Sequence, residues 1–400
     1  MNKLVLFGAG KIGRSFIGQL FSRGGYEVVF VDINPLVIDA LNRYREYKVV
    51  IKSEQGDELL WVKNVRGIHA SEAEKITAEL VSATLAAVSV GQRGLSQVIP
   101  LLARAIEQRH HTRRQPLDII LAENMRNAAE YVFTELQKIV SPAVPLDRMV
   151  GLVETSIGKM VPLMPPEEEQ KDILQVFAEP YNTLILDKKG FKNPVPSVPG
   201  LAPKENIKAW VDRKSFIHNF GHAAVAYTGF LYNPDFKYLY EALQVKAIRD
   251  FVRTAMHEAA AILMKKYPGE FTREDLSDHI DDLILRFQNK ALGDTIYRVG
   301  CDLKRKLSEN DRVAGLLHEG IKYNMPFDNI LFVLICGFCF RAKDSSGKMF
   351  LPDEEFLKET EQYGLGAMLK NHCGIHHPLI IEKALYFMKN LQKVFQEKIK

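Results

Sequence analysis

The sequence lacks any apolar run long enough to cross a membrane. A spanning helix needs about 20 consecutive apolar residues, whereas the longest candidate, residues 329–340, is shorter and is flanked by Asp328 and Arg341. The opening MNKLVLFGAGKIG differs from a secretion signal, because its short apolar run ends in glycines. We therefore expect a soluble protein that is neither inserted into a membrane nor exported.

Cysteine is scarce, with 4 residues in 400. Cys336 and Cys339 have the spacing of a redox pair, but they lie inside an apolar, helix-like run, which favours buried thiols. The segment HCGIHH, residues 372–377, suggests a metal, although its spacing matches no common zinc site. With few cysteines and no evident pairing, we expect a cytoplasmic protein without a metal.

An excess of charge of either sign is also absent, since the formal net charge is only +4. The tightest basic group, RHHTRR at residues 109–114, precedes a proline and is interpreted as a surface loop. Dispersed basic residues argue against nucleic acid as a partner. A mild positive excess does suit an enzyme with a small anionic ligand.

The first part of the chain alternates between β-rich runs and amphipathic stretches, which is typical of a doubly wound parallel sheet with helices on both faces. A chain of 400 residues is also too long for one ordinary core. Strands are expected at Lys3–Phe7, Glu27–Val31, Leu85–Val90, Asp118–Ala122 and Met149–Val153. Helices are expected at Lys11–Gly24, Pro35–Arg45, Leu95–Arg109 and Arg126–Val140, with an added hairpin over Val49–Val65.

The composition changes after the last of these strands. Residues 161–204 are rich in proline, glycine and lysine, which predicts an irregular connection. From residue 205 onward the apolar pattern is helical almost to the end. The sequence thus predicts an α/β domain over 1–160, a connection over 161–204 and a mainly α-helical domain over 205–400.

A glycine motif directly follows the first predicted strand and opens a helix. In GAGKIG the first glycine permits a tight turn, the second lets the backbone approach a pyrophosphate, and the third lets the helix pack on the sheet. Asp32 ends the second strand, where its carboxylate can bind an adenosine ribose and would repel a 2′-phosphate. A Rossmann-type domain that prefers NAD to NADP is expected, with a flavin or methyl-donor site as the alternative. The expected cofactor-binding residues are Gly8, Ala9, Gly10, Lys11, Ile12, Gly13 and Asp32.

Polar residues with catalytic potential are grouped on one predicted helix that begins near residue 205. At about 100° per residue, Lys214, Asn219 and His222 fall on one side of an α-helix, and His218 falls on the same arc. A buried lysine can accept a proton, and an asparagine can stabilise charge that develops on oxygen. The alternative reading is a solvated face of an ordinary helix.

Several segments resemble the polyol-specific long-chain dehydrogenases, the mannitol dehydrogenase family. KSFIHNFGHAAVAYTGFL resembles that family's Lys-x4-Asn-x2-His motif. Three further segments resemble the family in the same order along nearly the whole chain: GAGKIGRSFIGQL, LAENMRNAAEYV and GDTIYRVGCDLKRKLSENDRVAGLL.

The resemblance implies a role for each matching residue. Lys214 corresponds to the general base, Asn124 and Asn219 to the pair that stabilises the oxyanion, and His222 to a partner of the reacting hydroxyl. His218 is then left to packing. The matching substrate-binding stretch contains Arg298, Arg305 and Lys306.

One position departs from the family pattern. Where the family has an Asp-Arg pair, this chain has Lys159 and Met160. Lysine replaces an acceptor of hydroxyl groups by a donor that prefers an anion, so Lys159 is expected to contact the substrate.

The resemblance also implies the reaction, which is NAD-dependent interconversion of a polyol or its phosphate with the corresponding ketose. A chain near 400 residues is most similar to members that interconvert mannitol 1-phosphate and fructose 6-phosphate. The alternatives are reduction of a keto-sugar acid such as tagaturonate or fructuronate, oxidation of free mannitol, and a catalytically silent NAD-binding sensor. A monomer or a homodimer is expected.

Overall fold

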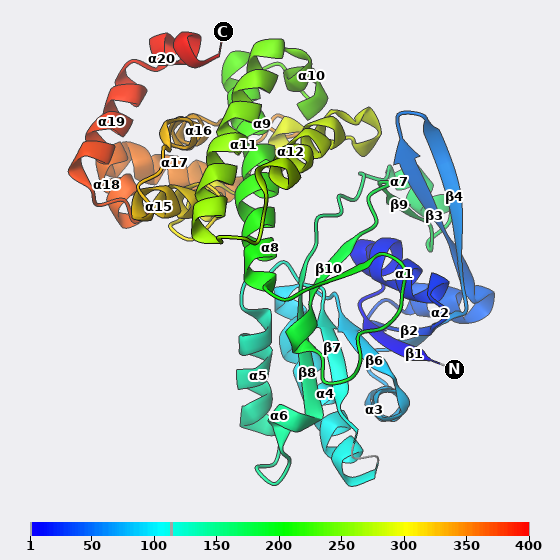
Figure 1. The fold of residues 1–400 in the computed structure, drawn as a ribbon. Coiled ribbons are helices and arrows are strands. Elements are labelled where there is room, and N and C mark those ends of the chain that lie inside the picture. Colours follow the sequence, from blue (N-terminus) through cyan, green and yellow to red (C-terminus); the bar gives the residue numbers. More distant parts are fainter. Residues whose placement is uncertain (1, 113–114, 400) are drawn as a thin grey trace. The chain divides into compact units, whose positions relative to one another are not determined.

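The computed structural model describes residues 2–112 and 115–399. It divides into two compact units, Met1–Val211 and Asp212–Lys400 (Figure 1). Within the described residues, no helix is long and apolar enough to pass through a lipid bilayer.

Unit 1 is built on an eight-stranded sheet of order β11-β10-β8-β7-β6-β1-β2-β5. Neighbouring strands run parallel except at β8 and β10, which are antiparallel. The order from β5 to β8 is that of a Rossmann sheet, whose switch point lies between β1 and β6. The strands are β1 (Lys3–Phe7), β2 (Glu27–Asp32), β5 (Val65–His69), β6 (Leu85–Val88), β7 (Leu117–Leu121), β8 (Val150–Ser156), β10 (Leu184–Asp187) and β11 (Leu201–Lys204).

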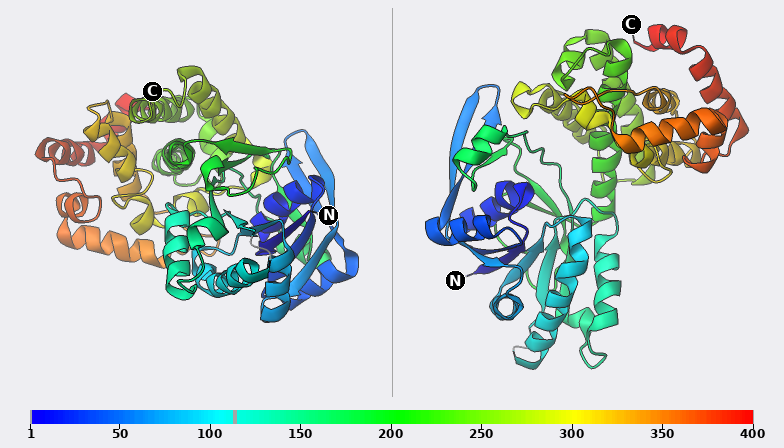
Figure 2. Two further views of the ribbon diagram at one scale, coloured as in Figure 1. Left: turned by 60° about the horizontal axis from the view of Figure 1, so that its bottom comes forward. Right: turned by 180° about the vertical axis from the view of Figure 1, so that it is seen from behind.

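Helices lie on both faces of this sheet, as Figures 1 and 2 show. Alternate residues of β1 enter different cores: Leu4 and Leu6 pack with α1 and α2, whereas Val5 and Phe7 pack with α3, α4 and α5. A strand buried on both faces must be apolar, which explains the continuous run LVLF after Lys3. The helical segments of unit 1 are η1 (Gly13–Gly18), α1 (Gln19–Arg23), α2 (Pro35–Tyr44), α3 (Ala73–Ser82), α4 (Gln92–Thr112), α5 (Ala128–Ile139), α6 (Leu146–Met149), α7 (Pro166–Lys171) and η2 (Lys188–Gly190).

The expected strands and helices of residues 1–160 are present, with ends shifted by a few residues. β6 ends at Val88 rather than Val90 because the N–H groups of Val90 and Gly91 donate to the Glu123 carboxylate instead of a neighbouring strand. β8 continues to Ser156 because its last residues pair with β10. The predicted hairpin is formed by β3 (Glu46–Ser53) and β4 (Gly56–Lys63), and it extends beyond the main sheet in Figure 1.

The segment 161–204 differs from the irregular connection that its composition predicts. It contains α7, η2 and three strands, of which β10 and β11 extend the main sheet. The third, β9 (Val176–Ala178), pairs with β3 in a separate three-stranded sheet. Each strand has only three or four residues, so a composition dominated by proline and glycine conceals it.

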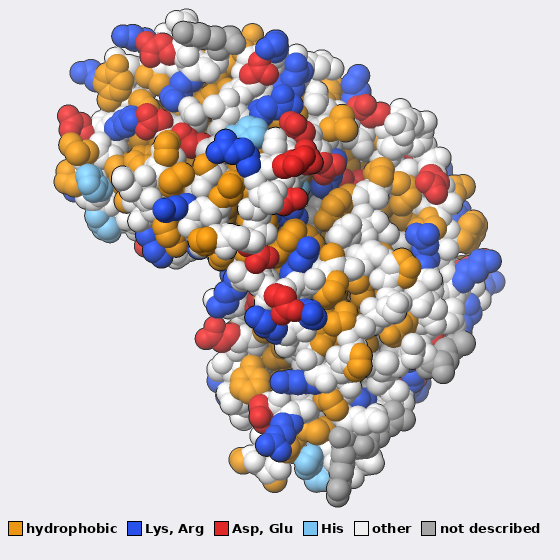
Figure 3. Space-filling view, viewed as in Figure 1, with side chains coloured by type: hydrophobic (Ala, Val, Ile, Leu, Met, Phe, Trp, Pro, Cys, Tyr) orange, Lys and Arg blue, Asp and Glu red, His pale blue; other side chains and the backbone are white. Residues whose placement is uncertain are grey.

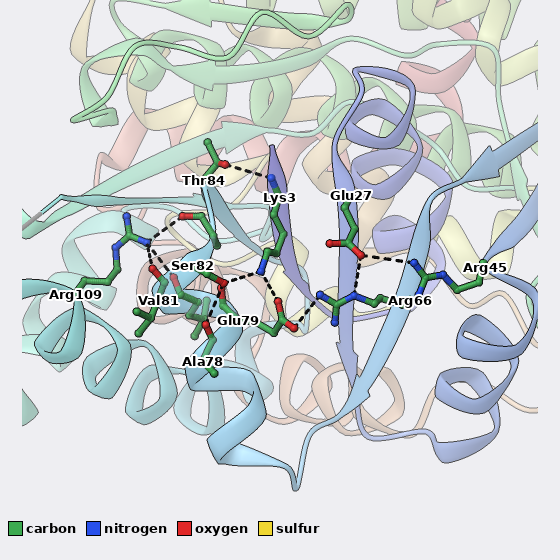
Figure 4. Close-up of polar contacts among 12 residues, drawn as sticks. Lys3, Glu27, Arg45, Arg66, Ala78, Glu79, Val81, Ser82, Thr84 and Arg109 are labelled. Carbon is green, nitrogen blue, oxygen red and sulfur yellow. Dashed lines mark hydrogen bonds and ion pairs between the residues drawn. The ribbon is translucent and has the colours of Figure 1, made fainter. Parts of the chain in front are cut away.

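The amino-terminal ends of the strands in unit 1 are joined by polar contacts (Figure 4). Arg66 donates to Glu27 and pairs with Glu79, and Lys3 binds the other oxygen of Glu79 at 2.6 Å. Burial alone would raise the pKa of Glu79, but its hydrogen bonds to Arg66 and Lys3 hold that pKa below its ordinary value. The two cations therefore favour the ionised form of Glu79.

The basic group at residues 109–114 differs from the predicted surface loop. Arg109 belongs to α4 and is only 2% exposed, and Arg113 and Arg114 lie outside the described residues. The Arg109 guanidinium donates to five backbone carbonyl oxygens, those of Leu80, Val81, Ala83, Gln115 and Pro116. Figure 4 shows it among the loops at this end of the sheet. Arg109 therefore supplies hydrogen-bond donors to backbone carbonyl groups near the end of α3 and in the segment before β7.

Unit 2 is entirely helical in its regular structure within residues 212–399, as the sequence predicts for 205–400. Its central helix, α9, packs against α10, α11, α13 and α16 and buries almost every side chain from Phe220 to Gly229. α8 (Ile207–Arg213) spans the point of division. The helical segments of unit 2 are η3 (Lys214–Asn219), α9 (Phe220–Tyr232), α10 (Leu239–Gln244), α11 (Lys246–Lys266), α12 (Arg273–Gln288), η4 (Lys290–Leu292), α13 (Ile296–Gly300), α14 (Leu303–Lys306), α15 (Ala314–Lys322), α16 (Asp328–Phe338), α17 (Leu351–Tyr363), α18 (Leu365–Asn371), α19 (Pro378–Lys389) and α20 (Leu391–Lys398).

The cysteines are free thiols. Cys336 is fully buried inside α16, and Cys339, which is partly exposed, immediately follows that helix. Burial raises the pKa of both thiols. In the described part of the chain, no cluster of three or more His, Cys, Asp or Glu side chains is arranged to hold a metal.

Candidate active site

The glycine motif forms a tight loop at the switch point of the sheet in unit 1. Gly8 has φ +97°, and a Cβ there would lie 2.1 Å from the carbonyl oxygen of Ser89. A Cβ at Gly13 would lie 2.0 Å from the carbonyl oxygen of Gly8. Around Gly10, by contrast, no described atom beyond its chain neighbours lies within 4 Å of the position that a Cβ would occupy. The loop is thus closed on its inner side and open at Gly10, as close approach of a phosphate requires.

Asp32 lies at the carboxyl end of β2, next to this loop. One oxygen accepts the backbone N–H of Ala9 at 2.6 Å and the other accepts that of Asn34 at 2.9 Å. Each carboxylate oxygen can accept more than one hydrogen bond, so Asp32 can hold the loop and still bind a ribose hydroxyl. Lys11 and Ile12 are the first helical residues after Gly10; Lys11 is exposed and pairs with Glu169 at 3.4 Å.

The end of β7 carries two further polar residues of unit 1. Asn124 is exposed there, whereas the preceding Glu123 is buried and accepts the N–H groups of Val90 and Gly91 at 2.8 and 3.0 Å. Burial raises the pKa of Glu123. The sequence predicts a role for Asn124 in this segment. It does not show that Glu123 holds the β6–α4 loop, because that contact forms only in the folded chain.

Lys159, which the sequence predicts to contact the substrate, makes its polar contacts within unit 1. Its side chain is buried and donates to the carbonyl oxygens of Glu179 and Tyr181 and to the Oδ1 atom of Asn182, at 2.7–3.2 Å. An ammonium has three N–H donors, and all three acceptors belong to unit 1. Lys159 therefore stabilises the segment after β9, and we leave it out of the proposed substrate-binding set.

In unit 2, Lys214 begins a π-helical turn, η3, which ends at Asn219. Hydrogen bonds from residue i to i+5 bring residues five apart above one another, so this turn aligns Lys214 with Asn219 more closely than an α-helix would. Just before it, Asp212 is held by Lys266 at 2.8 Å and by the hydroxyl of Tyr267 at 2.7 Å. The start of the π-turn is therefore anchored to α11.

The environment of Lys214 changes its protonation. Burial, followed by the positive charge of Arg312, lowers the pKa of Lys214 to about 8 from its ordinary value of 10.5. Asp311 opposes this shift and Arg305 adds to it. A lysine with such a pKa can exchange a proton near neutral pH, as a general acid–base group must.

His222 lies one turn further along, in α9. Its Nε2 atom is 3.0 Å from Oδ2 of Asp294, and its ring stacks on Phe287 with centroids 4.6 Å apart. His218 is 5% exposed and meets the same Phe287 ring edge-on. Burial, and then nearby arginines, lower the pKa of both histidines well below the ordinary value, so both are neutral at pH 7.

Basic side chains gather around these residues. Arg298 pairs with Asp294, and Arg305 pairs with Asp302 and Asp311. Lys306 is buried and donates to the carbonyl oxygen of Val299 at 2.6 Å. Burial, and then Arg312, lower the pKa of Lys306 to about 8.

Arg312 belongs to the same group, and its Nε binds Asp311 at 2.8 Å. Among residues 2–112 and 115–399, no hydrogen-bond partner is found for its two terminal amino groups, although the side chain is only 11% exposed. Arg312 acts electrostatically on Lys214, His222 and Lys306, which places it among them. Over the molecular face seen in Figure 3, basic and acidic side chains are otherwise interspersed.

The predicted residues thus form one set in each unit. The glycine loop, Asp32 and Asn124 belong to unit 1, and a second set belongs to unit 2: Lys214, Asn219, His222, Arg298, Arg305 and Lys306. Sequence reasoning missed Asp294, Asp311 and Arg312. Asp294 precedes Arg298 by four residues, a spacing typical of helical ion pairs, and that was the available signal.

Two family models match the chain. Residues 2–200 match the model described as "Mannitol dehydrogenase Rossmann domain", and residues 206–388 match "Mannitol dehydrogenase C-terminal domain".

Curated relatives match over most of their length. A mannitol-1-phosphate 5-dehydrogenase of Streptococcus mutans is 31% identical over 400 residues, which covers 98% of this chain and 100% of the relative. A protein of the same name from Buchnera aphidicola is 29% identical, covering 93% of this chain and 94% of the relative.

Solved structures share the fold. A mannitol 2-dehydrogenase of Pseudomonas fluorescens, solved as a ternary complex with NAD and D-mannitol, gives a TM-score of 0.76 at 14% identity, covering 100% of this chain and 93% of the other. A D-sorbitol dehydrogenase in substrate-free form gives a TM-score of 0.83 at 14% identity, with coverages of 99% and 94%.

Proposed function

Because the chain belongs to the mannitol dehydrogenase family, we propose that it is an NAD-dependent dehydrogenase that interconverts mannitol 1-phosphate and fructose 6-phosphate. In this proposal unit 1 binds the dinucleotide and unit 2 supplies the catalytic lysine and the cations that bind the substrate. Bound NAD would supply the hydride acceptor at its nicotinamide ring.

The observation that carries the proposal is the state of Lys214. An ordinary lysine is almost fully protonated at pH 7 and cannot accept a proton. With a pKa of about 8, Lys214 carries a proton below that pH and lacks one above it. It can therefore take the hydroxyl proton during alcohol oxidation and return it during carbonyl reduction.

The neighbouring amides and imidazole complete the proposed chemistry. The Asn219 side chain shares the π-turn with Lys214 and can donate an N–H to the reacting oxygen. Asn124, at the end of β7, is proposed as the second donor. His222, which is neutral at pH 7, is proposed to bind the reacting hydroxyl, and the buried His218 is left to packing.

The charges in unit 2 favour a substrate that carries an anionic group. Cations and carboxylates both lie in the group that contains Lys214, and the cations include four proposed to bind the substrate. The cations are Arg298, Arg305, Lys306 and Arg312, and the carboxylates are Asp294, Asp302 and Asp311. Guanidinium groups match the geometry of phosphate, so we propose that Arg312 and its neighbours bind the phosphate of the sugar.

The preference for NAD follows from Asp32. Its carboxylate faces the glycine loop, where it suits a ribose with free hydroxyls and would repel a 2′-phosphate. Ile33 and Asn34, the next two residues, carry no positive charge that could offset this repulsion.

A screen of NADH oxidation tests the proposal. Fructose 6-phosphate, fructose, tagaturonate and fructuronate are compared at equal concentration, each with NADH and with NADPH. We expect the highest kcat/KM with fructose 6-phosphate and NADH. Turnover of a uronate but not of fructose 6-phosphate would support the keto-sugar-acid alternative instead, since the same cations can bind a carboxylate. Absence of turnover with all four would contradict the proposal.

A further inference from the structure

A buried carboxylate outside the predicted catalytic set holds the His222 ring. Asp294 is 6% exposed, and each of its two oxygens has a different partner in unit 2. Oδ2 lies 3.0 Å from Nε2 of His222, and Oδ1 pairs with the Arg298 guanidinium. Asp294 thereby joins two residues that the proposed function assigns to substrate binding.

The backbone around Asp294 is fixed independently of these side chains. Gly293 precedes it with φ +65°, a conformation that ends the short helix η4 and redirects the chain. The carbonyl oxygen of Asp294 accepts the N–H of Leu239 at 3.0 Å, and Thr295 forms a β-bridge with Tyr238. The carboxylate is therefore held on a rigid support rather than on a loose loop.

The imidazole is constrained in two directions. The ring of Phe287 lies nearly parallel to the imidazole, with an interplanar angle of 14°. At the edge of the imidazole, Nε2 contacts the Asp294 carboxylate. A carboxylate can only accept a hydrogen bond, so Nε2 must carry the proton. Nδ1 of the neutral ring then has a free lone pair and acts as an acceptor.

We propose that Asp294 is a positioning residue that fixes His222 in the Nε2–H tautomer, so that Nδ1 accepts a hydrogen bond from a substrate hydroxyl. This inference rests on the proposed function for the identity of the substrate group, but the orientation of the ring does not depend on it. In other carboxylate–histidine pairs the carboxylate likewise accepts a hydrogen bond from one ring nitrogen and thereby fixes the tautomer.

The groups that face His222 support a neutral, oriented ring. Burial has the largest effect on its pKa, and the charges of Arg298, Lys306, Arg312 and Arg286 lower that pKa further. The neighbouring His218, with its ring centroid 6.1 Å away, is neutral as well. Asp294 thus serves to orient a neutral imidazole rather than to stabilise a charged one.

A double-mutant cycle tests whether Asp294 acts through His222. In Asp294→Asn the amide can turn its oxygen toward Arg298 and its N–H toward Nε2, which then has to accept. We expect kcat to fall about 10²-fold in the wild-type background and less than about 3-fold in the His222→Ala background, with NADH affinity unchanged in both. Asp281→Asn removes a carboxylate that pairs with Arg253 elsewhere in unit 2 and should leave kcat unchanged. Equal losses in both backgrounds would overturn the proposal.

A spectroscopic measurement provides a readout that does not need activity. Nitrogen-15 NMR of histidine-labelled protein, with His222→Ala used for assignment, distinguishes protonated from unprotonated ring nitrogens. The wild type should show a protonated Nε2 and an unprotonated Nδ1, and Asp294→Asn should shift the population toward the other tautomer. A wild-type ring protonated at Nδ1 would refute the inference even if Asp294→Asn failed to fold. If no substrate were turned over but the tautomer were as stated, the proposed function alone would fail.

Discussion

At the scale of single residues, the proposed chemistry depends on Lys214, the buried lysine that begins the π-turn η3. As the proposed base, Lys214 must be neutral to accept the hydroxyl proton during alcohol oxidation, and burial lowers its pKa to about 8. The rate of oxidation should therefore rise with pH through an apparent pKa near 8 and then level off, and carbonyl reduction should be favoured below that pH. Lys214→Ala should lower kcat by about 10²–10⁴-fold and remove this pH dependence. Steady-state kinetics from pH 6 to about 10 measures both effects.

The matched control for that variant is Lys208→Ala, since Lys208 is an exposed lysine on the preceding helix α8. It should leave kcat and the pH profile unchanged. His222→Ala should reduce kcat less than Lys214→Ala, and His218→Ala should reduce it least. An inactive His218→Ala protein combined with an active Lys214→Ala protein would show that the histidine transfers the proton.

The local sequence predicted the structural roles of some residues but not the tertiary contacts of others. The roles of Gly8 and Gly13 follow from motif and context, and the structure gives each a steric reason. The internal contacts of Lys159 could not be predicted, because the three acceptors come from residues 20–23 positions later that meet it only in the folded chain. Arg312 and Asp294 were missed for the same reason: their partners follow from tertiary placement.

At the scale of elements, local pattern predicted the type of each helix or strand better than its geometry. The helical-wheel argument assumed α-helical spacing for Lys214 and Asn219, whereas the structure has a π-turn between them. A second π-turn, η1, follows the glycine loop at Gly13–Gly18. Such turns are often found at functional sites, and no simple residue pattern marks them.

Arg109 provides a test of stability at the same scale. Arg109→Met should lower the free energy of unfolding by roughly 3 kcal/mol, because several buried carbonyl groups would each lose a charged hydrogen-bond donor. The matched variant Arg104→Met removes an exposed arginine of the same helix, paired with Glu74, and should cost less than about 1 kcal/mol. Urea unfolding of both variants measures the difference. Equal stabilities would show that water replaces the Arg109 contacts without loss.

At the scale of the whole molecule, alternating and helical periodicity separated a sheet-based part from a helical part. The contacts divide the chain between Val211 and Asp212, later than the break in composition that suggested the first domain ends at residue 160. The difference arises because β10 and β11 join the main sheet, a pairing between distant strands that composition cannot reveal. We retain the assignment of cofactor binding to the first part and of catalysis to the second as a proposal.

Transfer of deuterium tests the central claim most directly, namely that the chain moves a hydride between nicotinamide and the carbonyl carbon of a sugar phosphate. Fructose 6-phosphate is incubated with NADH labelled with deuterium at C4 of the nicotinamide, prepared separately in each stereochemical form. For one of the two forms we predict mannitol 1-phosphate that carries one deuterium on the former carbonyl carbon, seen by NMR and mass spectrometry. Product that lacks deuterium with both labelled forms, or oxidation of NADH without formation of the polyol phosphate, would contradict the account.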